Sequence, residues 1–243
     1  MYELDATTDS PKMVEETAVA HKPRRRRLPL PLTFEERADM GRQEMRVPAT
    51  FEQYLEFAED CEYRVHYRDG HIISFIEIDE KTKTIMGEAT ITHERIVMRI
   101  GHFLSLILGI ESDYQILGSN AKVFIGADRK GYNADALVIK GIAEEKSYKY
   151  NRRTMKGIVN PWLIVEILSQ STRKFDLAEK LEDYIQIPSL EQIIFLEQGS
   201  VWASTYIRTS SQEWRNIYFT TLDGQIPVAE GFISMAQIYS KIL

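Results

Sequence analysis

The sequence predicts an α/β fold with a mixed central sheet flanked by helices and with antiparallel strands at its periphery. Three observations predict it. An apolar run of strand length spans residues 162–168, a charged segment with helical spacing follows at residues 172–186, and a second apolar run spans residues 192–196. Strands that alternate with helices in this way pack as a sheet with helices on its faces.

The composition sets limits on the class of protein. The chain has 243 residues, 44% of them hydrophobic, and a formal net charge of −6, so nucleic-acid binding would require a local basic patch. The single cysteine, Cys61, excludes an internal disulfide and a cysteine-based zinc site. No apolar stretch reaches the length of a membrane span, and the N-terminus lacks the apolar core of a signal peptide. We therefore expect a cytoplasmic protein with no membrane partner.

Residues 1–46 are predicted to be a mobile N-terminal tail, and residues 47–243 to form the folded domain. The tail contains a basic run at residues 22–27 and leucines spaced by prolines at residues 28–32. So few packed apolar residues cannot offset the entropy cost of ordering the segment. For the basic run, a solvated segment is favoured over a nucleic-acid contact. Residues 34–40 are expected to form one or two helical turns.

The first half of the domain is expected to contain two helices, a β-hairpin, three further strands and a loop. Thr50 is the expected N-cap of a helix over residues 51–58. Asp69-Gly70 joins two alternating segments and predicts a β-hairpin. A core helix follows, because the apolar residues between 93 and 108 recur on one face. Three apolar runs then predict strands at residues 114–117, 121–125 and 134–139. The lysine-rich stretch between the last of these runs and Pro161 is expected to be a loop.

The second half begins with the strand–helix–strand block described above. After it, alternating segments predict a peripheral antiparallel extension, and a short helix is expected at residues 234–242. The alternating segments are residues 201–208, 214–220 and 225–227.

One acidic residue, Glu166, lies inside the apolar run at residues 162–168. Burying an ionised carboxylate costs several kcal/mol unless a cation or hydrogen-bond donors replace water. A second acid, Asp135, opens another apolar run upstream. If the two strands are neighbours, the carboxylates lie side by side and repel each other unless a cation sits between them. Mg²⁺ prefers such hard oxygen ligands, so the pair predicts a Mg²⁺ site, with Mn²⁺ as a substitute metal.

The helix that follows Glu166 carries a polar stripe. At about 100° per residue, its four members fall within an arc of roughly 80°, beside an apolar arc that would pack on the sheet. The members are Arg173, Asp176, Lys180 and Tyr184. The same spacing equally fits a solvated flank in which Asp176 and Lys180 form an ordinary i,i+4 pair. His93 falls on an apolar helix face, where a core histidine bonded to the backbone is favoured over a catalytic role.

Other chemistries lack their motifs. The sequence has no glycine-rich phosphate loop, no Gly-x-Ser-x-Gly elbow and no pair of histidines at metal-ligand spacing.

The residues around Glu166 resemble the core signature of the Uma-two family, restriction endonucleases of the PD-(D/E)XK nuclease superfamily. The matching residues are Glu166-Ile-Leu-Ser-Gln-Ser-Thr-Arg173, Asp176, Lys180-Leu-Glu-Asp-Tyr184 and Ile187-Pro-Ser-Leu190. Three further stretches agree: the Asp69-Gly70 hairpin, Met86-Gly-Glu-Ala89 leading to His93, and Asn133-Ala-Asp135. The resemblance covers about residues 47–243.

This resemblance implies a restriction-endonuclease-like fold in which Asp135 and Glu166 hold the metal. The superfamily lysine usually lies two residues after the acid, where Leu168 stands, and would here have moved onto the helix as Lys180. Two positions depart from the family pattern. Ala134 replaces a proline, and His66 stands where the family has a glutamate four residues before the hairpin glycine.

The predicted function is a Mg²⁺-dependent endonuclease that hydrolyses DNA phosphodiester bonds. The predicted catalytic residues are Asp135, Glu166 and Lys180, and the supporting residues are His66, His93, Arg173, Asp176 and Tyr184. A non-catalytic nucleic-acid-binding or protein-binding member of the same fold is the alternative, and a metal-dependent hydrolase with another substrate is a third. DNA is the expected partner, and a homodimer is left open.

Overall fold

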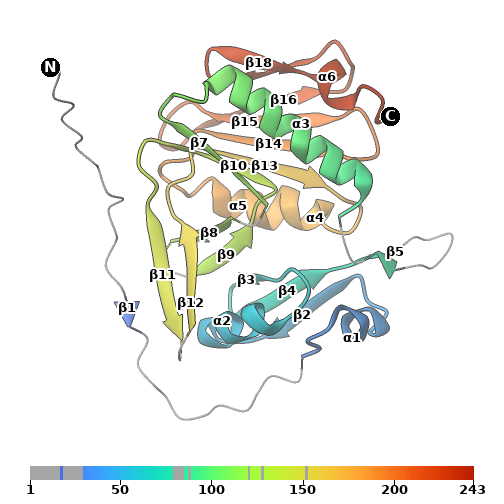
Figure 1. Ribbon diagram of the computed structural model, residues 1–243, viewed down its shortest axis with the longest axis vertical. Helices are drawn as coiled ribbons and strands as arrows, with labels where there is room; N and C mark the ends of the chain where they lie inside the picture. The colour runs from blue at the N-terminus through green and yellow to red at the C-terminus, as the bar shows by residue number, and fades with distance from the viewer. Residues whose placement is uncertain are drawn as a thin grey trace, which may run out of the picture.

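Two large sheets form the body of the protein in the computed structural model, which describes residues 17–18, 30–78, 85–86, 89–119, 121–126, 129–150 and 153–243. The central sheet has six strands in the order β16-β15-β14-β13-β10-β7. The second sheet has eight strands in the order β1-β11-β12-β8-β9-β3-β4-β2 and lies below the central one in Figure 1. Two short two-stranded sheets pair β17 with β18 and β5 (Glu77–Ile78) with β6 (Ile85–Met86).

The central sheet is mixed, as the sequence predicts. Its strands are β7 (Tyr114–Gly118), β10 (Ala136–Lys140), β13 (Leu163–Leu168), β14 (Gln192–Glu197), β15 (Ala203–Arg208) and β16 (Trp214–Phe219). β13 runs parallel to β14, whereas the other neighbouring pairs are antiparallel. β15 and β16 extend this sheet at one edge as antiparallel strands, as predicted for residues 201–208 and 214–220, whereas the predicted segment at residues 225–227 pairs with β18 instead.

The two faces of β13 carry different side chains, because successive residues of a strand point to opposite sides. Leu163, Val165 and Ile167 belong to the core beneath α3 (Ile91–Leu108), which also includes residues from β17 (Gln225–Val228), β18 (Gly231–Ser234) and α6 (Met235–Tyr239). Ile164 and Leu168 belong to the core on the opposite face. β13 is therefore buried on both of its faces.

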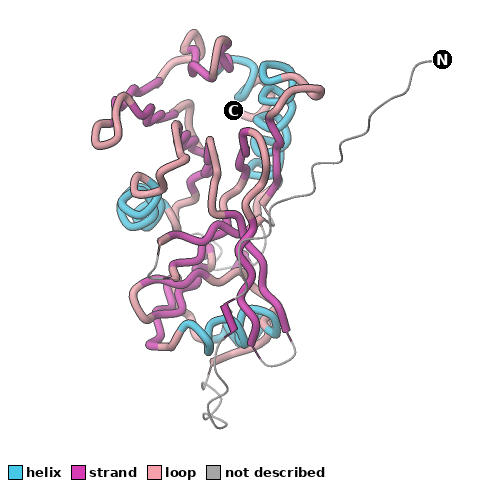
Figure 2. The backbone as a smooth tube through the Cα atoms, turned by 90° about the vertical axis from the view of Figure 1, so that its left-hand side faces the viewer, coloured by secondary structure: helices cyan, strands magenta, loops and turns pink. Residues whose placement is uncertain are grey.

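A continuous helical segment covers that opposite face and lies between the two sheets (Figures 1 and 2). It consists of α4 (Arg173–Phe175), the π-helical turn η1 (Asp176–Lys180) and α5 (Leu181–Tyr184). Phe175 and Tyr184 are buried in the core against the central sheet. We refer to residues 173–184 as the site helix.

The second sheet packs on α2 (Phe51–Asp60), whose N-cap Thr50 forms the predicted start with a capping box to Gln53. Besides β11 and β12, which are described below, the second sheet contains β1 (Thr17–Ala18), β2 (Glu44–Pro48), β3 (His66–Arg68), β4 (His71–Phe75), β8 (Lys122–Ile125) and β9 (Lys130–Asn133). Asp69 and Gly70 have φ angles of 47° and 76°, as the hairpin turn between β3 and β4 requires. Phe51 packs edge-on against Tyr67 and Tyr148, so an aromatic cluster joins the helix to the sheet.

The lysine-rich stretch predicted to be a loop is instead a hairpin of β11 (Glu145–Tyr150) and β12 (Arg153–Ile158). Tyr148 is 2% exposed and packs on the aromatic cluster, while most described neighbours on its strand are partly exposed. A strand that buries so few of its side chains has little hydrophobic alternation, and the sequence prediction was wrong for this reason.

The folded unit starts earlier than residue 47, because the predicted boundary falls inside β2. Residues 34–40 form the predicted helical turns as α1 (Phe34–Asp39), and Leu30, Leu32 and Phe34 pack against the aromatic cluster. The predicted mobility of the remaining tail concerns residues 1–16 and 19–29, which lie outside the described residues.

Arg37 ties this early segment to the second sheet. It is fully buried, and its guanidinium donates to the Ser74 hydroxyl at 2.8 Å and to the carbonyls of Arg42 and Gln43 at 2.8 and 3.2 Å. A buried arginine held by carbonyl groups leaves no hydrophobic signal in the sequence, which explains why the boundary was misplaced. Within the described part of the chain, no helix is long and apolar enough to cross a membrane.

We predict that Arg37→Met lowers the free energy of unfolding by about 2–4 kcal/mol, because several buried acceptors lose their donor. Arg42→Met, an exposed neighbour, should change it by less than about 0.5 kcal/mol. Urea denaturation of both variants measures the difference. Equal stability of the two variants would show that residues 30–46 do not contribute to the fold as described.

Candidate functional site

The two acids predicted to hold a metal lie opposite each other on neighbouring strands. β10 and β13 are antiparallel with Ala136 paired to Val165, so extending the register by one residue places Asp135 opposite Glu166. The Asp135 N–H donates to the Val165 carbonyl at 3.1 Å, which continues the ladder to this point. Both side chains line one cavity of about 450 Å³.

That cavity lies between the central sheet, the second sheet and the start of α3. It also includes the loop that leads from β13 into the site helix. Its lining residues include Arg64, His66, Thr90, His93, Asp135, Glu166, Ser169, Ser171, Thr172, Asp176 and Lys180.

Glu166 is held by two side chains of the site helix. It is 2% exposed, and its Oε1 accepts hydrogen bonds from the Tyr184 hydroxyl at 2.6 Å and from Lys180 Nζ at 3.0 Å. Lys180 Nζ also lies 2.9 Å from Asp176 Oδ1, so one ammonium is shared by two buried carboxylates. Burial, together with the charges of Asp176 and Asp135, holds the pKa of Glu166 above its ordinary value despite the opposing charge of Lys180.

Lys180 remains a cation in this setting. Burial lowers its pKa, but the attraction of Asp176 and Glu166 outweighs that effect and raises the pKa above the ordinary lysine value. The site therefore contains the positive charge of Lys180 beside the carboxyl group of Glu166, whose pKa is raised.

Asp135 is held by a different set of donors. Its Oδ2 accepts from the Ile167 N–H at 2.8 Å and lies 3.2 Å from His93 Nε2, whereas its Oδ1 accepts from Arg64 Nη1 at 3.2 Å. Burial acts to raise the pKa of Asp135, but His93 and Arg64 lower it to about 2. Asp135 is therefore ionised at neutral pH.

The structure brings most of the predicted site residues together. Lys180 Nζ lies 3.0 Å from Glu166 Oε1, so the structure places the helix lysine beside this carboxylate. Asp176 and Lys180 are 2% and 4% exposed, so the interpretation of this pair as a solvated flank is wrong. His93 is buried, but its partner is the Asp135 carboxylate rather than the expected backbone group.

Arg173 is the predicted residue that lies elsewhere. Its guanidinium pairs with Glu197 and lies 5.0 Å from the ring centre of Trp202, and it does not line the cavity. Arg173 lies in the first turn of the site helix and pairs there with Glu197, the last residue of β14. Lys180 and Tyr184, further along the same helix, contact Glu166.

His66 lies beneath the cavity and is neutral. It is 5% exposed and packs on Phe175 with 5.6 Å between ring centres. Burial lowers its pKa well below the ordinary value, and the positive charges of Lys180 and Arg64 lower it further. Its Nδ1 has no hydrogen-bond partner among the described residues.

Sequence reasoning missed Arg64, which contacts Asp135 from the second sheet. No local pattern marks it, because Arg64 precedes β3 and its partner Asp135 lies 71 residues away in the chain. Two carboxylates and the cations around them thus make up the candidate centre. In the ranges that the structure describes, no cluster of three or more histidine, cysteine or acidic residues is arranged to hold a metal.

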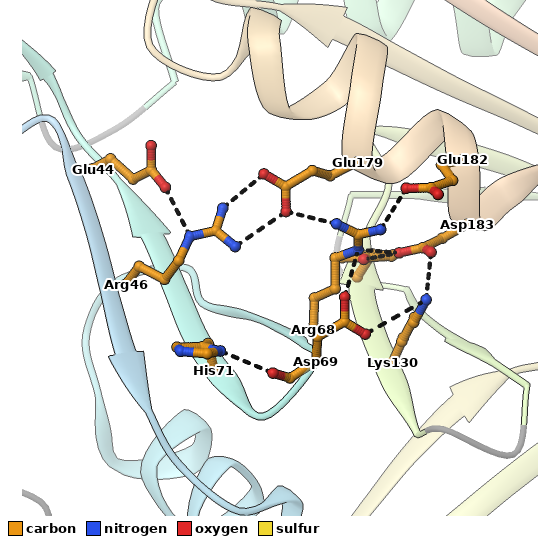
Figure 3. Close-up of polar contacts among 10 residues, drawn as sticks. Glu44, Arg46, Arg68, Asp69, His71, Lys130, Glu179, Glu182 and Asp183 are labelled. Carbon is orange, nitrogen blue, oxygen red and sulfur yellow. Dashed lines mark hydrogen bonds and ion pairs between the residues drawn. The ribbon is translucent and has the colours of Figure 1, made fainter.

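A second polar network fixes the other side of the site helix to the second sheet (Figure 3). Arg68 of β3 donates to Glu179 at 3.0 Å, to Glu182 at 2.6 Å and to Asp183 at 2.9 Å. Asp183 is fully buried and also accepts from Lys130 at 2.6 Å and from the Tyr132 hydroxyl. Because Asp183 and Tyr184 are adjacent, this network sets the position of the tyrosine that holds Glu166.

Comparison with known proteins agrees with this geometry. The family model named Uma2, described as "Putative restriction endonuclease", matches residues 51–236. The chain belongs to the Uma2 family. Two uncharacterized proteins of Synechocystis sp. are similar to this Uma2 protein. One, sll1609, is 28% identical over 141 residues, which cover 56% of this chain and 76% of that protein. The other, slr1290, is 25% identical over 173 residues, which cover 71% and 80%.

A solved structure shows the same fold. A crystal structure from Anabaena variabilis, described as "a putative nuclease belonging to DUF820", matches this Uma2 protein with a TM-score of 0.54 and 12% identity. The match covers 78% of this chain and 98% of that one. The predicted restriction-endonuclease-like fold is confirmed.

We predict that Asp183→Asn lowers the free energy of unfolding by about 3 kcal/mol, because it removes the charge that Arg68 and Lys130 share in a buried position. Glu182→Gln, which changes an exposed partner of the same arginine, should cost less than about 1 kcal/mol. Denaturant unfolding measures both variants. Similar losses in the two would contradict the assignment of Asp183 as the centre of the network.

Proposed function

We propose that this protein is a Mg²⁺-dependent endonuclease that hydrolyses DNA phosphodiester bonds, with Mn²⁺ as a substitute metal. The observation that carries the proposal is the Lys180 ammonium, 3.0 Å from Glu166, in the cavity where Asp135 faces that same glutamate. Two acids and a fixed lysine in one cavity are the parts that phosphodiester hydrolysis uses. The family description and the description of the structural relative support a nuclease.

The donor set suits a hard divalent cation. Mg²⁺ binds through one or two carboxylates and completes its shell with water and substrate phosphate oxygens, so Asp135 and Glu166 are sufficient protein ligands. Asp135 is ionised, and the raised pKa of Glu166 means that a cation beside it would stabilise the ionised form. Such a cation would polarise the scissile phosphate and lower the pKa of an attacking water.

The remaining residues position these groups. Lys180 supplies a preorganised positive charge for the oxygens of the phosphate as negative charge develops on them. Tyr184 and Asp176 fix the direction of Glu166 and Lys180, respectively. His93 and the Ile167 N–H hold Asp135 through its Oδ2.

A non-catalytic nucleic-acid-binding role is the second candidate, and His66 is the observation that favours it. A neutral, buried imidazole stands at this position, where the family that the sequence resembles has a glutamate. A site with two acids instead of three would bind metal more weakly. Cleavage assays separate this candidate from the first.

We predict that the protein nicks or linearises supercoiled plasmid DNA in Mg²⁺ or Mn²⁺ and that Asp135→Asn abolishes this activity. Lys180→Ala should slow single-turnover cleavage about a hundredfold, because one preorganised charge at the reacting phosphate is lost. Lys174→Ala, an exposed lysine of the same helix, is the control and should cleave at the wild-type rate. Equal rates for the two lysine variants, both checked for folding by circular dichroism, would refute the role of Lys180.

Metal binding has its own readout, thermal stability without DNA. Millimolar Mg²⁺ or Mn²⁺ should raise the melting temperature, because a ligand that binds only the folded state stabilises it in proportion to the logarithm of its concentration. Asp135→Asn should remove this shift, whereas the exposed Asp39→Asn should keep it. A shift of the same size in Asp135→Asn would place the metal elsewhere.

A further inference from the structure

Arg64 differs from the other cations of the cavity in its exposure. Its side chain is 44% exposed, whereas the side chains of His93 and Lys180 are 10% and 5% exposed. Lys180 is bound to two carboxylates inside the protein and cannot move outward without leaving both of them unpaired. Arg64 lines the same cavity and is the cation there that an incoming molecule meets first.

The contacts of Asp135 show what Arg64 does in this structure. Oδ2 is engaged by His93 and by the Ile167 N–H, which belong to the rigid part of the fold. Oδ1 is engaged by Arg64, the exposed partner. Oδ1, which accepts one hydrogen bond where Oδ2 has two donors, is thus the oxygen left for a cation, and a cation bound there would repel the guanidinium.

We propose that Arg64 is the phosphate-binding residue of this site: it pairs with Asp135 while no divalent cation is bound, and it turns to a phosphate of the nucleic-acid strand when a cation occupies Oδ1. This inference rests on the proposed function, because it requires a cation at Asp135. A planar guanidinium with five N–H groups is suited to the task, since it binds two phosphate oxygens at once.

The surroundings favour this exchange. His66, which also lines the cavity, is a neutral imidazole and brings no negative charge that would hold the guanidinium there. A displaced Arg64 keeps its place at the mouth of the cavity, where half of its side chain already meets solvent. Binding of the cation and binding of the phosphate are therefore coupled. A cation at Asp135 releases Arg64 to bind the phosphate, and a phosphate bound to Arg64 leaves Oδ1 of Asp135 open to the cation.

The test compares Arg64→Gln with Arg129→Gln. Arg129 is a matched control, because its side chain is 37% exposed, it pairs with one carboxylate, Glu52, at 2.9 Å, and it does not line the cavity. Each variant removes one positive charge from the whole protein. Fluorescence anisotropy of a short labelled DNA duplex, in Ca²⁺ to allow binding with slow turnover, measures the affinity for DNA. The Mn²⁺ concentration at half-maximal thermal shift, without DNA, measures the affinity for metal.

Opposite effects on the two affinities are expected. Arg64→Gln should weaken DNA binding about tenfold and reduce its salt dependence by the equivalent of about one phosphate contact. The same variant should bind Mn²⁺ as well as the wild type or better, because a competitor for Asp135 is gone. Arg64→Lys should lie between the wild type and Arg64→Gln in DNA affinity, since it keeps the charge but loses the two-point contact. Arg129→Gln should match the wild type in both measurements.

Two results would overturn the inference. The first is a DNA affinity of Arg64→Gln equal to that of Arg129→Gln. The second is weaker Mn²⁺ binding by Arg64→Gln than by the wild type, which would mean that Arg64 only supports the structure of the site. Either result in a protein whose wild type cleaves DNA leaves the proposed function intact. Conversely, a wild type that binds metal and shows Arg64-dependent DNA binding without cleavage would retain the inference and favour the non-catalytic role.

Discussion

The burial of one ammonium group between two carboxylates is the interaction on which the rest of the site depends. Removing Lys180, Glu166 and Asp176 from water costs several kcal/mol per charge, and only close, well-directed contacts offset this cost. The contacts exist only while the site helix is held at a fixed distance and angle from β13. Two sets of polar contacts serve that requirement: Lys180 and Tyr184 hold Glu166 from the helix, and Arg68 and Lys130 hold the helix itself through Asp183.

The second sheet is therefore part of the site and not an accessory to it. Arg68 and Lys130 attach the outer side of the site helix to β3 and β9, while the inner side of the helix holds Glu166. Arg64 and His66 enter the cavity from the same sheet. The central sheet supplies the two acids, while His66 and the preceding Arg64 line the cavity from the opposite side. The segment at residues 30–46 belongs to the same unit, because β2 pairs with β4.

Sequence reasoning succeeded where a single residue broke a strong pattern. A lone acid in an apolar strand identified Glu166, and spacing of four residues identified Lys180 and Tyr184. It failed where the information lies in contacts between distant segments. Arg37 and Arg64 act on groups far from them in the chain, so no local pattern marks them. The hairpin of β11 and β12 was missed because it buries few side chains, and Arg173 was misplaced because helical spacing does not reveal its distant partner Glu197.

The π-helical turn between Asp176 and Lys180 has a consequence for how the chain can change in length. A π-helical turn contains one residue more than the α-helical turn it replaces, so deleting one residue there restores a regular helix. Everything beyond the deletion would then rotate by about 100° relative to what precedes it. Asp183 and Tyr184 both lie beyond the deletion, so they would turn away from Arg68 and Glu166 together while the start of the helix kept its place. The number of residues between Glu166 and Tyr184 is thus constrained as strictly as their identities.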